Sequence, residues 1–124
     1  MALATEWGIS YILPRIVGVS RATEMLLTGD FVDIADAERW GLVSKVVPAE
    51  ALMKTAKELA ARLATGPSFA HRQIKHAIRN GLHTNYASQI EYEAYIQSMC
   101  RNTEDHKEAT TAFLEKREPK FKGR

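Results

Sequence analysis

Apolar side chains recur at helical spacing along most of the chain. The clearest example follows the pattern i, i+4, i+7, i+8, i+11 and consists of Leu52, Ala56, Leu59, Ala60 and Leu63. Such spacing places the side chains on one face of an α-helix. The same kind of periodicity predicts further helices over residues 6–15, 20–28, 35–40, 68–82, 84–99 and 104–116. We therefore expect a mainly α structure.

Capping residues, glycines and prolines indicate where these helices begin and end. Ser20 and Asp33 carry side chains that cap helix N-termini, and Gly29 is typical of a helix stop. Pro14 should interrupt the first helix, since proline lacks a backbone N–H. Residues 42–47 are rich in valine and too few for a helix, so we predict that they are extended.

Composition sets the class of protein. The 124 residues are 45% hydrophobic and 26% charged, with 17 basic and 15 acidic side chains for a net charge of +2. This is enough apolar content for a folded core and excludes wholesale disorder. No apolar run reaches the roughly 18 residues of a membrane helix. The single Cys100 excludes an internal disulfide, and we expect a cytoplasmic protein.

Histidines and basic residues gather between residues 71 and 83. His76 and His83 are seven residues apart, but no carboxylate stands where it would complete a metal site, so we expect none. The basic stripe is suited to nucleic acid, phosphate groups or an acidic helix, although a solvated outer helix face is the preferred interpretation. The stripe consists of Arg72, Lys75, His76, Arg79 and His83.

The two ends of the chain contain other candidates. Glu6 is surrounded by apolar neighbours, and a poorly hydrated carboxyl suits proton transfer near neutral pH. The alternative is a first-turn glutamate favoured by the helix dipole. Residues 115–124 hold five basic and two acidic side chains, with Phe121 among them and Phe113 just before. That mixture suits a ligand with a ring and phosphates, whereas a frayed terminus is the alternative.

Several segments together resemble the enoyl-CoA hydratase/isomerase (crotonase) superfamily, in the order the family has them. They are residues 6–18 (EWGISYILPRIVG), 22–29 (ATEMLLTG), 35–38 (ADAE), 41–48 (GLVSKVVP) and 112–124 (AFLEKREPKFKGR). Ala109 departs mildly, because the family often has glycine there. The resemblance is to the C-terminal half of family chains, which are roughly twice as long.

The resemblance implies a fold and a division of the chain. It implies the helical C-terminal part of a crotonase-like α/β spiral fold, with one or two short extended segments. Residues 1–48 would form the last core helices and a short extended segment, and residues 49–124 a C-terminal helical region for oligomerisation. The N-terminal spiral core, which supplies both oxyanion-hole N–H groups in the family, would be absent.

The resemblance also implies site residues. Glu6 matches the glutamate that acts as acid/base in Δ3,Δ2-enoyl-CoA isomerases, and Phe113 and Lys116 match residues that help to hold the CoA nucleotide. The implied substrate is an acyl-CoA thioester, with no further cofactor, and the implied assembly is a trimer-based homo-oligomer. Whether the reaction is hydration or isomerisation stays open.

Three functions follow as hypotheses. The first is an acyl-CoA-processing enzyme, inactive as this chain alone because the oxyanion hole is missing. The second is a non-catalytic helical oligomerisation module or truncated remnant, and a weaker third is a basic nucleic-acid-binding helical domain. A C-terminal half without its core should expose an apolar patch around Ile9, Ile12, Leu13 and Leu26, or bury it by self-association.

Overall fold

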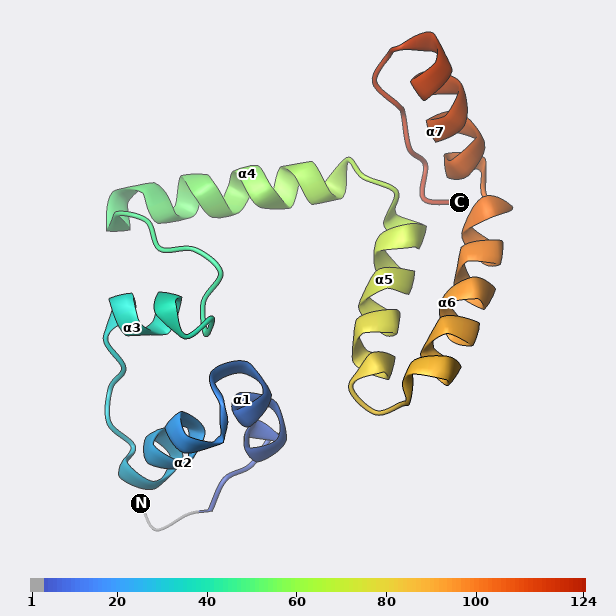
Figure 1. Cartoon of the computed structure of the whole chain (residues 1–124). Coiled ribbons are helices and arrows are strands. Elements are labelled where there is room, and N and C mark those ends of the chain that lie inside the picture. The colour runs from blue at the N-terminus through green and yellow to red at the C-terminus, as the bar shows by residue number, and fades with distance from the viewer. Residues whose placement is uncertain (1–3) are drawn as a thin grey trace. The chain divides into compact units, whose positions relative to one another are not determined.

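The computed structural model describes residues 4–124, and its helices fall into two compact units that divide between Leu52 and Met53 (Figure 1). Within this described range there is no β-strand, so the predicted mainly α class is confirmed. Residues 42–47, predicted to be extended, form bends and irregular backbone instead of a paired strand. None of the helices in the described part is long and apolar enough to cross a membrane.

The first unit is built on two helices that pack against each other. They are α1 (Ile9–Val17) and α2 (Val19–Thr28). Their contact buries Leu13, Val17 and Ala22, and partly buried apolar side chains surround these three. The core of this unit is therefore small, and most of its stability depends on a few side chains.

The exposed patch predicted on these helices is wrong for most of its members. Leu13 is only 4% exposed, because it belongs to the core between α1 and α2. Ile9 and Leu26 pack against that core and are partly buried. Only Ile12 is well exposed, at 48%. The contact between α1 and α2 thus buries much of the apolar surface of the two helices.

The predicted cap of α2 and the predicted break in α1 are also wrong. Ser20 does not cap α2, because Gly18 is the N-cap and the helix begins at Val19. Gly18 has φ 86°, a left-handed value that lets the chain pass from α1 to α2 without a longer loop. Pro14 lies inside α1 and does not interrupt it, and its carbonyl still accepts the N–H of Gly18 at 3.0 Å.

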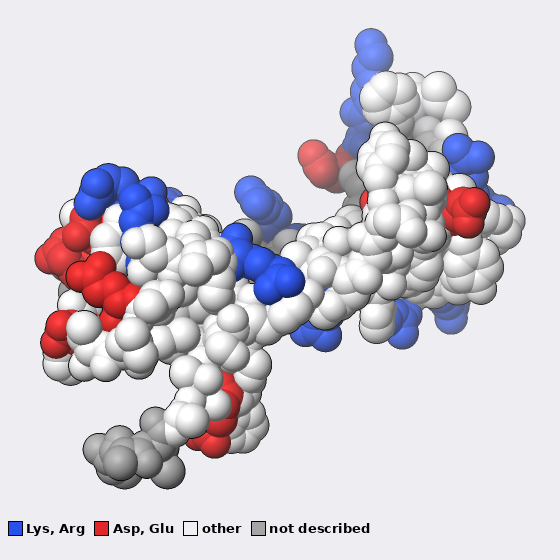
Figure 2. Space-filling view, turned by 60° about the horizontal axis from the view of Figure 1, so that its bottom comes forward, with Lys and Arg blue, Asp and Glu red and all other residues white. Residues whose placement is uncertain are grey.

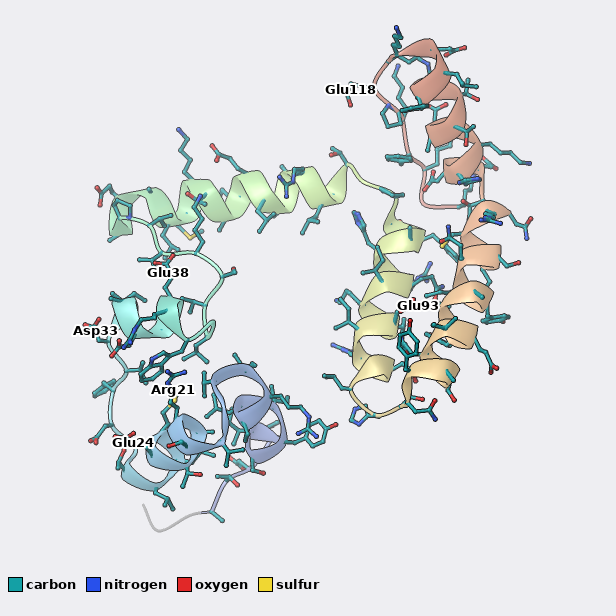
Figure 3. All side chains as sticks on the ribbon, viewed as in Figure 1. Arg21, Glu24, Asp33, Glu38, Glu93 and Glu118 are labelled. Carbon is teal, nitrogen blue, oxygen red and sulfur yellow. The ribbon has the colours of Figure 1, made fainter. Side chains whose placement is uncertain are left out.

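The cap at Asp33 is confirmed. The Asp33 carboxylate accepts the N–H of Ala35 at 2.8 Å and begins α3 (Ile34–Arg39), as its residue type predicts. Figure 3 shows Asp33 at the start of α3 and labels Glu38 on the same helix. The short 3₁₀ turn η1 (Ala49–Ala51) follows.

The second unit contains the four remaining helices, each close to its predicted range. They are α4 (Leu52–Ala64), α5 (Ser68–Gly81), α6 (Tyr86–Arg101) and α7 (Glu104–Glu115). The helices α5 and α6 lie side by side as an antiparallel pair (Figure 1). The helix α7 follows directly after α6 and contacts it.

Gln89 on α6 joins the α5–α6 pair. Its amide nitrogen donates to the carbonyl of Ala77 on α5 at 3.0 Å, and its amide oxygen accepts from the side chain of Asn80 at 2.9 Å. The same nitrogen donates to Glu93 at 3.2 Å, and Figure 3 labels Glu93 on α6. These bonds set the register between α5 and α6.

Much of the apolar surface of the second unit is uncovered. The predicted apolar face of α4 exists, but Leu59 and Leu63 on it are half exposed. Ile74 and Ile78 on α5 are 53% and 64% exposed. Figure 2 shows wide areas with neither basic nor acidic side chains. Hydrogen bonds of Gln89 to Ala77 and Asn80 join α5 to α6, and Ile96 of α6 is buried.

Candidate functional site

Glu6 stands at the entrance to α1. Its carbonyl accepts the N–H of Ile9 at 3.2 Å, and its side chain is exposed. The next two residues, Trp7 and Gly8, have φ values of 60° and 75°, and Gly8 is the N-cap of α1. This double left-handed turn directs the chain into the helix one residue after Gly8, leaving Glu6 just outside it.

Phe113 and Lys116 stand at the exit of α7. Phe113 is 83% exposed on the last turn of the helix. Lys116 is the C-cap, with φ 54°, and its N–H donates to the carbonyl of Phe113 at 3.2 Å. The two residues are three positions apart and both are accessible. The structure therefore brings these two predicted site residues together.

Each of these two segments contains a non-glycine residue with left-handed backbone. Trp7 and Lys116 are the only non-glycine residues with positive φ in the part of the chain that the structure describes. An L-residue in this conformation costs roughly 1–2 kcal/mol, and such strain concentrates at functional sites. One of these residues is adjacent to Glu6 and the other is itself a predicted site residue. Glu6 belongs to the first unit, whereas Phe113 and Lys116 belong to the second.

An ion-pair cluster fixes the exit of α7. Arg117 holds Glu108 in a two-bond pair at 2.6 and 3.0 Å, and it also binds Glu115 at 2.6 Å. The N–H of Lys120 donates to Glu108 at 2.8 Å. The Arg117 guanidinium, and then the Lys120 N–H, lower the pKa of Glu108 from 4.5 to about 2. The same pairs raise the pKa of Arg117.

Asp105 fixes the last residues of the chain. This aspartate is only 3% exposed, and its carboxylate accepts the N–H groups of Lys122 at 2.6 Å and Gly123 at 2.9 Å. Its own N–H donates to the carbonyl of Arg124 at 3.0 Å. The frayed basic terminus considered above is therefore wrong, because the segment folds back along α7.

Phe121 does not act with Phe113 as the sequence suggests. It lines a cavity of about 270 Å³ between α5, α6 and α7, together with Ile74, Ile96 and Cys100. Phe113 is 83% exposed, whereas Phe121 is partly buried and lines this cavity. Sequence reasoning missed Asp105 and Glu108 as anchors of the tail. The available signal was the acidic first half of α7 facing a strongly basic terminus.

No metal centre is present among the residues described. Within 4–124, no group of three or more His, Cys, Asp or Glu side chains lies close enough to hold a metal ion. His76 and Arg79 instead line a shallow hollow with two other basic residues of α5.

The chain belongs to the enoyl-CoA hydratase/isomerase family. The sequence model of that family, described as Enoyl-CoA hydratase/isomerase, matches residues 2–124. The fold agrees, since the crystal structure of an enoyl-CoA hydratase from Bacillus anthracis matches 99% of the chain at 35% identity with a TM-score of 0.92. The structure described above is thus the helical C-terminal part of a crotonase-like fold.

Two characterised relatives extend the comparison. The 1,2-epoxyphenylacetyl-CoA isomerase of Escherichia coli K12 is 35% identical over all 124 residues, which are 47% of its own length. The crotonyl-CoA hydratase of Syntrophomonas wolfei is 36% identical over 121 residues, which are 46% of its length. The chain therefore spans about half the length of the relatives it matches.

Proposed function

We propose that this chain forms the C-terminal half of an acyl-CoA-processing enzyme of the enoyl-CoA hydratase/isomerase type. The observation that carries the proposal is the match over its whole length to that family. Relatives named for a CoA-thioester isomerase and for a crotonyl-CoA hydratase support a CoA thioester as the substrate class. CoA enters as part of the substrate, and the proposal includes no separate cofactor.

Glu6 is the proposed acid/base. In a shift from a 3-enoyl to a 2-enoyl thioester, its carboxylate removes a proton from C2, the C–H electron pair forms a C1=C2 bond, and the carbonyl electron pair moves to the oxygen to give an enolate. The enolate then re-forms its carbonyl, the C1=C2 pair becomes the C2=C3 bond, and the former C3=C4 pair takes the proton back from Glu6 at C4. One exposed carboxylate at a chain turn can reach both carbons, provided that donors stabilise the enolate oxygen. The left-handed Trp7–Gly8 turn, which keeps Glu6 outside α1, supports this role.

Phe113 and Lys116 are the proposed contacts to the CoA nucleotide. An accessible ring suits stacking on adenine, and a lysine beside it suits a phosphate. Both side chains are exposed, and the Arg117–Glu108 pair holds the backbone that carries them. Following the family resemblance, we infer that they serve the site of a neighbouring subunit in a trimer-based homo-oligomer.

The experiment compares the chain alone with a completed enzyme. The 124-residue chain is purified by itself and also fused to the N-terminal half of the Bacillus anthracis relative. Both preparations are assayed for crotonyl-CoA hydration and for 3-enoyl-CoA isomerisation. We expect no turnover by the chain alone, because losing even one oxyanion donor costs about a hundredfold or more. The fusion should turn over at least one substrate.

Either of two outcomes would contradict the proposal. A fusion that folds, as judged by circular dichroism, and binds CoA but turns over neither substrate would remove the enzymatic assignment. Turnover by the chain alone at ordinary enzyme rates would show that the oxyanion donors lie within these 124 residues. The ratio of the two activities in the fusion also decides between hydratase and isomerase.

A second candidate function is assembly without catalysis. The half-exposed Leu52, Leu59 and Leu63 on α4 favour it, because such faces are usually covered by another surface. Light scattering of the chain alone tests this candidate directly. A concentration-dependent trimer with no activity in the fusion would support it, and a clean monomer would exclude it. We also propose that the protein works in the cytoplasm, where a reducing environment suits a chain with one cysteine.

A further inference from the structure

The helix α5 carries a face made only of basic side chains. Arg72, Lys75, His76 and Arg79 are all exposed and together line a shallow cavity of about 150 Å³ with no other residue. We call these four residues the α5 basic face. Their spacing of three and four residues places them on adjacent turns of one side of the helix.

The α5 basic face points away from the packed side of its helix. Ala77 and Asn80 bind Gln89 of α6, and Ala70 and Ile74 line the cavity against α6 and α7. At 3.6 residues per turn, these packed positions centre about half a turn from the basic ones. The basic side chains are therefore not needed to hold α5 in the unit.

No acidic side chain neutralises this face within the described chain. Lys75, His76 and Arg79 form no ion pair or side-chain hydrogen bond among residues 4–124, and Arg72 contacts only the ring of Phe69, 5.2 Å from its centre. The sequence contains no Asp or Glu between Glu58 and Glu91.

The basic residues of the C-terminal tail show the opposite arrangement. Arg117, Lys122 and Arg124 are each paired with a glutamate of α7. Like charges three and four residues apart destabilise a helix slightly. The α5 basic face keeps that repulsion, which a bound anion would relieve.

We propose that the α5 basic face binds a diphosphate group. Arginine guanidinium groups bind phosphate oxygens in pairs and lysine adds a point charge, so three permanent cations match an anion with two adjacent phosphates. The four side chains line one shallow hollow of about 150 Å³, where they face the same small volume. This site is separate from Phe113 and Lys116 and does not depend on the proposed enzymatic activity.

The experiment measures anion binding to the ¹⁵N-labelled 124-residue chain by NMR at low ionic strength. The probes are inorganic pyrophosphate, sulfate, CoA and a single-stranded RNA of about ten nucleotides. The test variant is Lys75→Gln/Arg79→Gln. The matched control is Lys57→Gln/Arg62→Gln, which removes the same two charges from exposed positions of α4. Circular dichroism checks that both variants keep their helical content.

We expect saturable pyrophosphate binding with shifts at residues 72–79. The affinity should fall about tenfold or more in the α5 variant and by less than about twofold in the α4 control. Binding should weaken as salt rises from 0.01 to 0.15 M, because the Debye length shortens from about 30 to about 8 Å. If the α5 variant also loses CoA binding, the diphosphate belongs to a nucleotide. If CoA binding is unchanged, the ligand is inorganic or belongs to another molecule.

Three results would overturn the proposal. The first is absence of saturation at millimolar pyrophosphate. The second is an equal loss in the α4 control, or an equal affinity for sulfate, because either would indicate unspecific attraction of anions. The third is RNA binding at least a hundredfold tighter than pyrophosphate through the same residues, which would make the face a nucleic-acid interface.

Discussion

The entrance to α1 carries the proposed acid/base and the exit of α7 carries the proposed nucleotide contacts, and the two segments are built differently. Both contain a left-handed residue that is not glycine, Trp7 at the entrance and Lys116 at the exit. At the exit, the Arg117–Glu108 pair and the buried Asp105 hold the chain in place. At the entrance, Trp7 is 91% exposed, and the carbonyls of Glu6 and Gly8 accept backbone N–H groups of the first turn of α1.

The difference teaches which part of the site the chain organises for itself. The segment proposed to contact the nucleotide is held by ion pairs and hydrogen bonds within the second unit. The segment with the proposed acid/base contains the left-handed Trp7, whose side chain is almost fully exposed. A strained backbone persists only when its surroundings enforce it. We therefore expect the α7 exit to tolerate perturbation of the first unit, and the α1 entrance to be sensitive to it.

The largest expected effect comes from the core beneath the entrance. Leu13→Ala removes one of three buried side chains and should destabilise the first unit by about 2–5 kcal/mol. Urea unfolding followed by the fluorescence of Trp7 and Trp40 measures this change. Ile12→Ala is the matched control, because Ile12 is 48% exposed. This substitution should lower the free energy of unfolding by well under half as much as Leu13→Ala. Equal costs at the two positions would contradict the assignment of Leu13 to the core.

A smaller effect is expected at the exit. The two oxygens of the Asp105 carboxylate each accept one backbone N–H, whereas the amide of Asp105→Asn has only one oxygen that can accept. The substitution should lower the free energy of unfolding by about 1–3 kcal/mol. Hydrogen exchange of the Lys122 and Gly123 amides measures the loss of protection. Glu104→Gln removes only exposed ion pairs and should leave these amides protected. Loss of protection in both variants alike would mean that net charge, not the Asp105 carboxylate, holds the tail.

The sequence predicted helix positions better than helix surroundings. Apolar spacing located α4 to α7 because periodicity is a local property, and Asp33 was recognised because a cap acts over two residues. Burial is a property of the partner surface, so the pattern could not tell Leu13 from Ile12. Gly18 replaced Ser20 as the cap because the α1–α2 connection required a positive φ.

The site residues stay predictions. Glu6, Phe113 and Lys116 are implied by the family resemblance, and the structure has the latter two at one helix end. The opposite charges of α7 and the tail were visible in the sequence, but the partners of Asp105 and Glu108 were not, because the backbone N–H groups that they bind lie 12 to 18 residues away. The left-handed state of Trp7 also carries no residue-level signal, since tryptophan rarely adopts it.

Replacing the left-handed residues sharpens the comparison further. Lys116→Gly and Trp7→Gly each remove a strain of roughly 1–2 kcal/mol, and glycine's greater freedom in the unfolded chain offsets part of it. We expect a gain in stability of up to about 1 kcal/mol for each, measured by thermal unfolding. Lys116→Gly should at the same time weaken CoA binding by the completed enzyme. A variant that is more stable and binds CoA normally would show that Lys116 has no ligand role.

The smallest effect is the response of the exit to acid. The pKa of Glu108 is lowered to about 2 in the folded chain, so its contribution to stability is present above pH 4.5. That contribution is lost as the pH falls from 4.5 toward 2. Protection of the Lys120 amide should decline over this window, and Glu108→Gln should flatten the profile. A Lys120 amide that stays equally protected down to pH 2 would contradict the Glu108 anchor.

The central claim is that Glu6 moves the proton, and one substitution tests it most directly. In the fusion with the N-terminal half of the Bacillus anthracis relative, Glu6→Gln keeps the shape of the side chain and removes its basicity. We expect the rate of 3-enoyl-CoA isomerisation to fall by about a hundredfold or more, with CoA binding unchanged. Glu24→Gln on α2 should retain the full rate. A Glu6→Gln enzyme as fast as the unmodified fusion would contradict the account.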